Sequence, residues 1–306
     1  MSGVALSVGN FDGVHLGHAA LIERAREVVG ADGRVVAMAF DPHPRSVLAK
    51  GGTPGRLTTF EHRRELLRAL GADEVERLTP TEELLGRSPE AFVDGVLRRH
   101  EVGVFVEGED FCFGKGRAGD VGTLEAIGRE RGFGVSVVGP VEASLANQTV
   151  VTCSSSIARW LLARGRVEDA ARVLGRAYEV RGEVVRGDRR GRAIGFPTAN
   201  VRTEQVLPAD GVYAGVATID GMASGVSAAV HVGPRGTFDA PERTMEVHLI
   251  GWTPSGDTEA YGASIRVGLL SWVRGNVRFE SVGHLVDQLG RDVERCGALV
   301  MQGADA

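Results

Sequence analysis

Two histidines spaced three residues apart follow a short apolar run near the start of the chain. The stretch GNFDGVHLGH (9–18) contains His15 and His18, with Gly17 beside the second. The spacing of apolar residues predicts a buried strand over 4–8 and a helix after the motif. The N-terminus of a helix offers free backbone N–H groups and the positive end of the helix dipole, which suit phosphate. The two histidines therefore predict phosphate chemistry, in which they stabilise the charge that builds on a leaving pyrophosphate.

A second stretch, GRAIGFPTANV (191–201), carries the groups that a phosphoryl-transfer site needs. Gly191 and Gly195 allow the backbone to approach phosphates closely. Thr198 and Asn200 supply side-chain oxygens two residues apart, on one face of an extended segment, and such oxygens are suited to Mg²⁺. A turn leading into a strand explains the same residues when the stretch is taken alone.

Short apolar runs alternate with helical periodicity over the first half of the chain. This alternation predicts a parallel sheet covered by helices on both faces. Two further helices are expected after the sheet, over 154–165 and 167–175, and the serines that open the first are good N-caps. The strands are expected over 4–8, 34–40, 102–108 and 134–141, and the helices between them over 19–29, 61–70, 89–100 and 122–132.

After about residue 177 the pattern changes to short strands separated by glycine-rich turns. This pattern predicts a small antiparallel barrel or sandwich, closed by a final helix over roughly 281–295. We therefore expect two domains, 1–177 and 178–306. The second-half strands are expected over 178–187, 211–220, 225–233, 244–252 and 264–274.

Composition narrows the class of protein. A formal net charge of -5 argues against a general nucleic-acid binder. Three widely spaced cysteines suggest neither a disulfide framework nor a zinc pattern, which favours a reducing compartment. With no apolar run of membrane-spanning length and no signal-peptide pattern, we expect a cytoplasmic protein without nucleic-acid or membrane partners. The sequence gives no indication of the oligomeric state.

Five motifs in chain order carry a resemblance to a known family. His15-Leu16-Gly17-His18 resembles the H-x-G-H signature of the nucleotidyltransferase superfamily. Together with four further motifs it resembles the bacterial bifunctional riboflavin kinase/FAD synthetase family over nearly the whole chain. The resemblance implies a Rossmann-like nucleotidyltransferase domain followed by a small antiparallel β-barrel with a C-terminal helix. The four further motifs are FDPHP (40–44), GEDFCFGKGRAGD (108–120), SSSIAR (154–159) and GFPTAN (195–200).

For the first domain, the resemblance implies transfer of AMP from ATP to FMN, giving FAD and pyrophosphate with the help of Mg²⁺. His15 and His18 would bind the ATP phosphates and stabilise the transition state. Asp110, Lys115 and Arg117 would contact the flavin, although a solvated glycine-rich loop explains that stretch equally well. Further nucleotide-binding residues are expected in the loop under the nucleotide and at the start of a later helix: Gly9, Asn10, Asp12, Gly17, Ser154, Ser155, Ser156 and Arg159.

For the second domain, the resemblance implies phosphorylation of riboflavin by ATP. Glu246 would accept the proton of the ribityl 5′-hydroxyl as that oxygen attacks the γ-phosphorus. Alternation in TMEVHLI (244–250) predicts that Glu246 and His248 point away from the apolar face of their strand. Thr198 and Asn200 would hold Mg²⁺. Nucleotide contacts are implied for Gly191 and Gly195, and flavin contacts for Arg266 and Arg274, near Tyr261-Gly262.

The chain departs from the family pattern at several positions, which leaves alternatives open. In the first domain, Ile157 stands where an extra arginine is common, and Ala158 replaces a larger apolar residue. The kinase half departs more, so the same chemistry on a modified flavin, or a weakened kinase half, is an alternative. A further alternative is a non-catalytic regulator that binds a flavin or a nucleotide. The presence of chemically active groups in both halves argues against this alternative. The kinase departures are His231, Gly236, Gly251 and Gly268.

Overall fold

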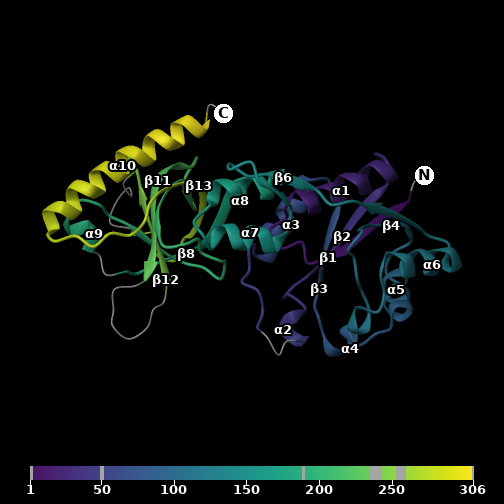
Figure 1. The fold of residues 1–306 in the computed structure, drawn as a ribbon. Coiled ribbons are helices and arrows are strands. Elements are labelled where there is room, and N and C mark those ends of the chain that lie inside the picture. The colour runs from purple at the N-terminus through teal and green to yellow at the C-terminus, as the bar shows by residue number, and fades with distance from the viewer. Residues whose placement is uncertain (1–2, 49–51, 188–189, 235–242, 253–259, 305–306) are drawn as a thin grey trace. The chain divides into compact units, whose positions relative to one another are not determined.

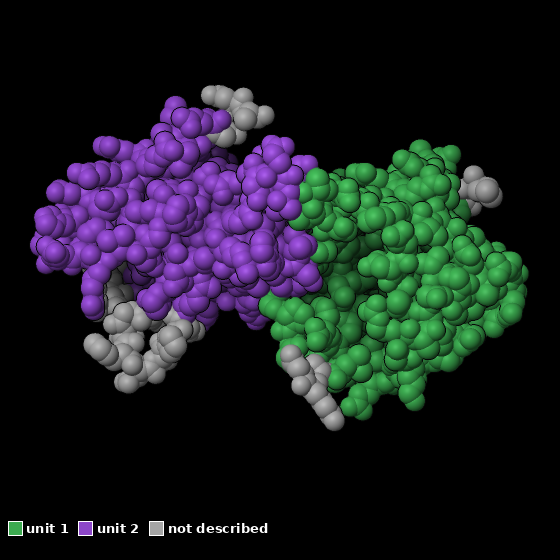
Figure 2. All heavy atoms as spheres, viewed as in Figure 1, with its two compact units in different colours: residues 1–143, 150–155 green, residues 144–149, 156–306 purple. Residues whose placement is uncertain are grey.

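The computed structural model describes residues 3–48, 52–187, 190–234, 243–252 and 260–304. It forms two compact units, shown in separate colours in Figure 2. The first comprises residues 1–143 and 150–155, and the second 144–149 and 156–306. Among the described residues, no helix is both long enough and apolar enough to cross a membrane.

The first unit contains a five-stranded parallel sheet in the order β3-β2-β1-β4-β5 (Figure 1). Hydrophobic periodicity does not predict β3, because three of its five residues are charged. As an edge strand, β3 is the place where a sheet tolerates charge best. The strands are β1 (Val4–Gly9), β2 (Arg34–Phe40), β3 (Glu74–Leu78), β4 (Val102–Gly108) and β5 (Gly134–Val138).

Helices cover both faces of this sheet, as predicted. Ala5 of β1 packs with Ile22 and Leu67 on one face, whereas the next residue, Leu6, packs with Phe92 on the other. The first face is covered by α1 (Leu16–Val29) and α3 (Phe60–Ala69), and the second by α5 (Pro89–Leu97) and α6 (Val121–Arg131). The shorter elements are α2 (Arg45–Leu48), α4 (Glu82–Leu85), η1 (Lys115–Arg117), β6 (Glu142–Ser144) and β7 (Val150–Thr152).

The second unit is built on a closed six-stranded antiparallel barrel in the order β10-β11-β12-β9-β8-β13, which decides between the predicted barrel and sandwich. The final helix, α10 (Val282–Ala304), is longer than predicted and lies across the barrel (Figure 1), where Cys296 packs against Val212 and Ala214. The strands are β8 (Tyr178–Val185), β9 (Ala199–Arg202), β10 (Gly211–Ile219), β11 (Val226–Pro234), β12 (Arg243–Leu249) and β13 (Ser264–Arg274). The remaining helices are α7 (Ser155–Leu162), α8 (Val167–Leu174) and α9 (Arg190–Ala193).

A buried carboxyl group lies between the two central strands of the parallel sheet. The paired register of β1 and β4 ends at Leu6 and Phe105, and beyond it the N–H of Val8 donates to Oε1 of Glu107 at 2.8 Å. Glu107 is 1% exposed. Burial raises the pKa of this carboxyl well above its usual range, because the charged form loses its hydration.

This raised pKa makes folding stability depend on pH. Between the ordinary and the raised pKa the folded chain keeps a proton that the unfolded chain releases, so stability falls as pH rises through that window. Glu107→Gln keeps an oxygen for the Val8 N–H and cannot ionise. We expect its melting temperature to exceed that of wild type at pH 8, with the difference vanishing near pH 4. Glu109→Gln, at an exposed position, is the control. A lower melting temperature for Glu107→Gln at pH 8 would show that the charged form is needed.

Candidate active sites

The two histidines of the first motif lie together at the start of α1. His15 is the residue before the helix, and His18 lies in its first turn, where its N–H donates to the His15 carbonyl at 2.8 Å. Their rings stack with centroids 3.6 Å apart. A Cβ at Gly17 would lie 3.1 Å from the His15 ring, so glycine gives that ring its room. The motif therefore brings two imidazoles to a helix N-terminus, as predicted.

The loop before α1 has an unusual backbone that local interactions hold in place. Phe11 and Val14 have φ of 48° and 42°, and positive φ is rare for a β-branched residue. Between them, the carboxylate of Asp12 accepts hydrogen bonds from the N–H groups of Leu57 and Thr58. Backbone strain of this kind costs about 1–3 kcal/mol per residue and persists where the surroundings impose it. Asp12 thus holds the loop in this conformation, and its carboxylate accepts hydrogen bonds from the protein itself.

A buried arginine that the sequence analysis missed ties this loop to the sheet. Arg63 of α3 is 3% exposed, and its Nη1 donates to the carbonyls of Asn10 and Phe40, each at 2.8 Å. Its Nη2 lies 3.9 Å from Asp12 and 3.6 Å from Asp41. Burial lowers the pKa of Arg63, whereas these two carboxylates raise it. The sequence around Arg63 does not predict its burial, because the carbonyl groups that it contacts belong to segments distant in sequence.

Asp41, in the FDPHP motif, lies at the centre of a group of arginines at the end of β2. Its carboxylate is within 3.4–3.8 Å of Arg56, Arg63 and Arg77. A small pocket of about 70 Å³ opens here at the ends of β1 and β2. The three guanidinium groups face the carboxylates of Asp41 and Asp12, and Arg77 also pairs with Glu61 at 2.8 Å, so positive and negative charges are balanced at this edge of the sheet. Its lining includes Asn10, Asp12, Asp41, Arg56 and Arg63.

The serines of the SSSIAR motif lie at the start of α7. Ser155 is the first residue of that helix, and its hydroxyl donates to the Asp12 carbonyl at 2.7 Å. The structure thus brings the start of this helix to the loop that precedes α1. Ser154 also falls in the first unit, whereas Ser156 and Arg159 fall in the second. The assignment of Arg159 to an ATP phosphate stays a prediction.

In the barrel, the three residues predicted to carry the kinase chemistry meet on adjacent strands. β9 and β12 are paired so that Asn200 lies opposite Glu246, and directly opposed side chains share a face of the sheet. The hydroxyl of Thr198 donates to Oε2 of Glu246 at 3.3 Å. Met245 and Val247 are fully buried, whereas Glu246 is half-buried, so the predicted alternation is confirmed. A hydroxyl, an amide and a carboxylate therefore converge at one place.

Comparisons with known proteins match both halves of the chain. A family model described as FAD synthetase matches residues 1–153, and one described as riboflavin kinase matches residues 174–300. Over 301 residues the chain is 34% identical to the bifunctional riboflavin kinase/FMN adenylyltransferase of Escherichia coli (strain K12), covering 95% of this chain and 90% of the relative. The chain belongs to the bifunctional riboflavin kinase/FMN adenylyltransferase family.

A further relative carries the same description, and a solved structure shares the fold. The bifunctional riboflavin kinase/FMN adenylyltransferase of Bacillus subtilis (strain 168) is 33% identical, with 94% of this chain and 89% of the relative covered. A crystal structure described as a macrolide-efflux protein from Streptococcus pneumoniae is 29% identical, with a TM-score of 0.84, over 96% of this chain and 93% of that chain. The likeness in fold therefore extends over both family domains.

The flavin-binding residues predicted in the first domain lie on an ordered loop. Between β4 and α6 the chain closes on itself, since Phe113 and Gly119 exchange backbone hydrogen bonds of 2.9 and 3.0 Å. Asp110 lies just after β4, and Lys115 and Arg117 lie in η1; all three side chains are exposed. The Phe113 ring is buried, whereas residues 115–118 are exposed, so this loop is packed at its aromatic part and solvated at η1. The flavin contacts of the three polar residues stay predictions.

The other residues predicted for the kinase site, apart from Thr198, Asn200 and Glu246, differ in their surroundings. A Cβ at Gly191 would lie 2.3 Å from the Phe196 carbonyl oxygen, so this glycine is required to close the loop. Arg266 is exposed on β13, whereas Arg274, at the end of the same strand, donates to the buried carboxylate of Asp292 at 2.6–3.1 Å. Eight residues of strand separate the two arginines by roughly 26 Å. The structure does not bring them together.

The departures from the family pattern fall at different places in the barrel. His231 of β11 lies opposite Glu246 in the register, so one change is directly beside the proposed base. Gly251 lies in the turn after β12, and Gly268 lies within β13. Gly236 lies outside the described residues. In α7, Ala158 is fully buried, whereas Ile157 is half-buried.

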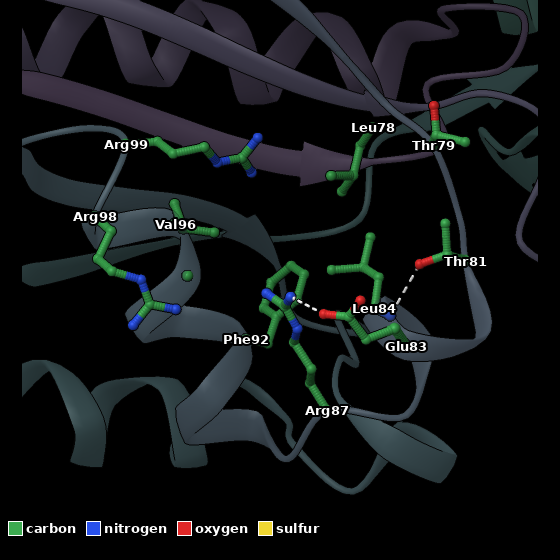
Figure 3. Close-up of a pocket in the computed structure, with 11 residues that line it drawn as sticks. Leu78, Thr79, Thr81, Glu83, Leu84, Arg87, Phe92, Val96, Arg98 and Arg99 are labelled. Atoms are coloured by element: carbon green, nitrogen blue, oxygen red, sulfur yellow. Dashed lines mark hydrogen bonds and ion pairs between the residues drawn. The ribbon is translucent and has the colours of Figure 1, made fainter.

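A larger pocket in the first unit contains none of the predicted residues. It has a volume of about 440 Å³ and lies beside the edge strand β3, between its end and helices α4 and α5 (Figure 3). Two of its three arginines are neutralised, since Arg87 pairs with Glu83 at 2.6 Å and Arg99 pairs with Glu76. Its charge therefore gives little basis for binding an anion.

Proposed function

We propose that this chain phosphorylates riboflavin to FMN in its barrel and adenylylates FMN to FAD in its parallel-sheet domain, with ATP as the donor in both steps. Family membership supports both reactions. The observation that carries the proposal is the meeting of Thr198, Asn200 and Glu246 on one face of the barrel, together with the stacked histidines at the start of α1. A regulator that only binds a flavin has no need of both groups.

In the adenylylation step, we propose that His15 and His18 bind the phosphates of ATP at the N-terminus of α1. A phosphate oxygen of FMN attacks the α-phosphorus, the bond to the bridging oxygen breaks, and pyrophosphate leaves. The two imidazoles and the helix N–H groups donate to oxygens whose negative charge increases in the transition state. Asp12 and Arg63 hold the loop that presents these groups.

In the kinase step, we propose that Glu246 accepts the proton of the ribityl 5′-hydroxyl as that oxygen attacks the γ-phosphorus, and that ADP leaves. The neutral oxygens of Thr198 and Asn200 beside one carboxylate fit a hard divalent cation that takes its other ligands from phosphate and water. We propose Mg²⁺, which would neutralise phosphate charge when bound. Within the described residues there is no cluster of three or more His, Cys, Asp or Glu side chains that forms a complete metal cage.

The position of His231 favours a second candidate function, in which the substrate is a modified flavin. Its position opposite Glu246 places a changed side chain next to the proposed base. The two candidates are separated by one assay, in which the purified chain is incubated with ATP, Mg²⁺ and riboflavin and the flavins are separated by chromatography. We expect both FMN and FAD to form. FAD from added FMN, with no product from riboflavin, would support the modified flavin or a lapsed kinase.

We further propose that residues 1–177 hold a complete adenylylation site, since every motif assigned to that step precedes this boundary. A fragment of residues 1–177 should convert FMN to FAD and should make no FMN from riboflavin. Circular dichroism and ATP binding establish that the fragment is folded, and its His18→Ala version is the control. A folded, ATP-binding fragment that makes no FAD would show that the site needs residues beyond 177.

A further inference from the structure

The face of β12 that carries Glu246 holds a histidine without a role in the proposed reaction. β12 and β9 are antiparallel with Asn200 opposite Glu246. The paired register ends at Val247 and Ala199, and His248 and Thr198 are the next residues of the two segments; residues two apart along a strand share a face. Thr198, Asn200, Glu246 and His248 therefore form the four corners of one polar patch on the sheet.

His248 contacts the chain just before Thr198. Its Nδ1 lies 2.8 Å from the carbonyl oxygen of Pro197. Its ring also meets the ring of Phe196 edge-on, with centroids 5.7 Å apart and an interplanar angle of 61°. Because a carbonyl oxygen can only accept, Nδ1 must carry the proton in this hydrogen bond.

The segment that His248 contacts lies outside the strand ladder. β9 begins at Ala199, and Pro197 has no N–H with which to extend the pairing toward β12. The N–H of Phe196 donates to the Gly191 carbonyl at 2.8 Å, which closes the loop on itself. The hydrogen bond from His248 thus joins the residue before Thr198 to the strand that carries Glu246.

We infer that His248 is a positioning residue of the kinase site, an inference that rests on the proposed function. Its ring fixes the Pro197 carbonyl and the Phe196 ring, and thereby sets Thr198 relative to Glu246, 3.3 Å away. This hydrogen bond holds the residue directly before Thr198, and the pairing of β9 with β12 holds the residue directly after it. A displacement of about 1 Å at a group that orients substrate lowers a rate by as much as roughly 10²-fold.

The test compares variants that separate the hydrogen bond from the ring. His248→Phe keeps an aromatic ring against Phe196 and loses the donor, whereas His248→Asn keeps an N–H near the position of Nδ1. In the full-length protein, we expect His248→Phe to lower kcat for riboflavin phosphorylation by about 10–100-fold, with KM for riboflavin within about twofold of wild type. His248→Asn should recover most of that loss. FAD synthesis from FMN should be unchanged in both.

His284→Phe is the matched control, since it makes the same change at an exposed position of α10. Wild-type kcat in His248→Phe would overturn the inference. So would equal loss in His248→Phe and His248→Asn, because restoring an N–H donor would then fail to restore activity. Loss of both FMN and FAD synthesis in His248→Phe would show a general folding defect and likewise count against a local role.

A second measurement remains decisive even if wild type phosphorylates no riboflavin and the proposed function fails. Nitrogen NMR of the labelled wild-type protein, assigned with His248→Phe, distinguishes the two neutral forms of the imidazole. We expect the His248 ring at pH 8 to carry its proton on Nδ1, as the bond to Pro197 requires. A proton on Nε2 would overturn the inference irrespective of any activity.

Discussion

Glu246→Gln is expected to lower riboflavin phosphorylation by about 10²–10⁴-fold, the range associated with loss of a general base. Glutamine keeps the size of the side chain and can still accept a hydrogen bond from Thr198, 3.3 Å away in wild type. It cannot readily take the hydroxyl proton. FAD synthesis from added FMN should remain at the wild-type rate, because the histidines assigned to that step lie on another domain. The measurement is the rate of each product by chromatography.

Two results would contradict this prediction. A Glu246→Gln variant with near wild-type kinase activity would show that the carboxylate does not accept the proton. Equal loss of both activities would point to a folding defect, which a melting curve detects. Thr244→Ala, a half-buried position two residues earlier on the same strand face, is the control for the strand itself. The wild-type assay comes first, because the change at His231 bears directly on this site.

The sequence predicted the parts of the fold that depend on hydrophobic periodicity. Four of the sheet's parallel strands, its major helices and five barrel strands follow patterns that burial alone imposes. Edge strand β3 carries charge, so its pattern was hidden. The expected boundary at residue 177 differs from the division into compact units, because α8 and most of α7 belong to the second unit. That division depends on packing between distant segments, which no local sequence pattern contains.

The candidate sites were predictable where one short segment supplies the chemistry. His15, Gly17 and His18 lie together because a single helix start positions them. Arg63 and the positive φ of Val14 were not predictable, because their roles arise only when distant segments meet. Alternation along the strand predicts that His248 shares the face of Glu246, but its hydrogen bond to Pro197 depends on the register between β12 and β9.

His18→Ala is expected to lower FAD synthesis from FMN by about 10²–10³-fold, the usual effect of losing one preorganised donor to a transition-state oxygen. The imidazole of His18 stacks on His15 at 3.6 Å, in the first turn of α1, where helix N–H groups also face the expected phosphates. Because the N–H groups and His15 remain, the loss should be partial. It should be larger for the rate than for ATP affinity, because the charge on the oxygens that His18 contacts increases in the transition state.

Glu246→Gln and His18→Ala serve as controls for each other. If each domain carries its own chemistry, Glu246→Gln loses FMN formation alone and His18→Ala loses FAD formation alone. His18 also contacts Phe11, with ring centroids 5.1 Å apart, so its removal disturbs packing near the strained loop. His18→Gln separates these effects, since the amide can still donate to phosphate but cannot stack as a ring. Partial recovery of FAD synthesis in His18→Gln would assign the effect to donation, whereas equal loss in both variants, with a matching fall in melting temperature, would make His18 a structural residue.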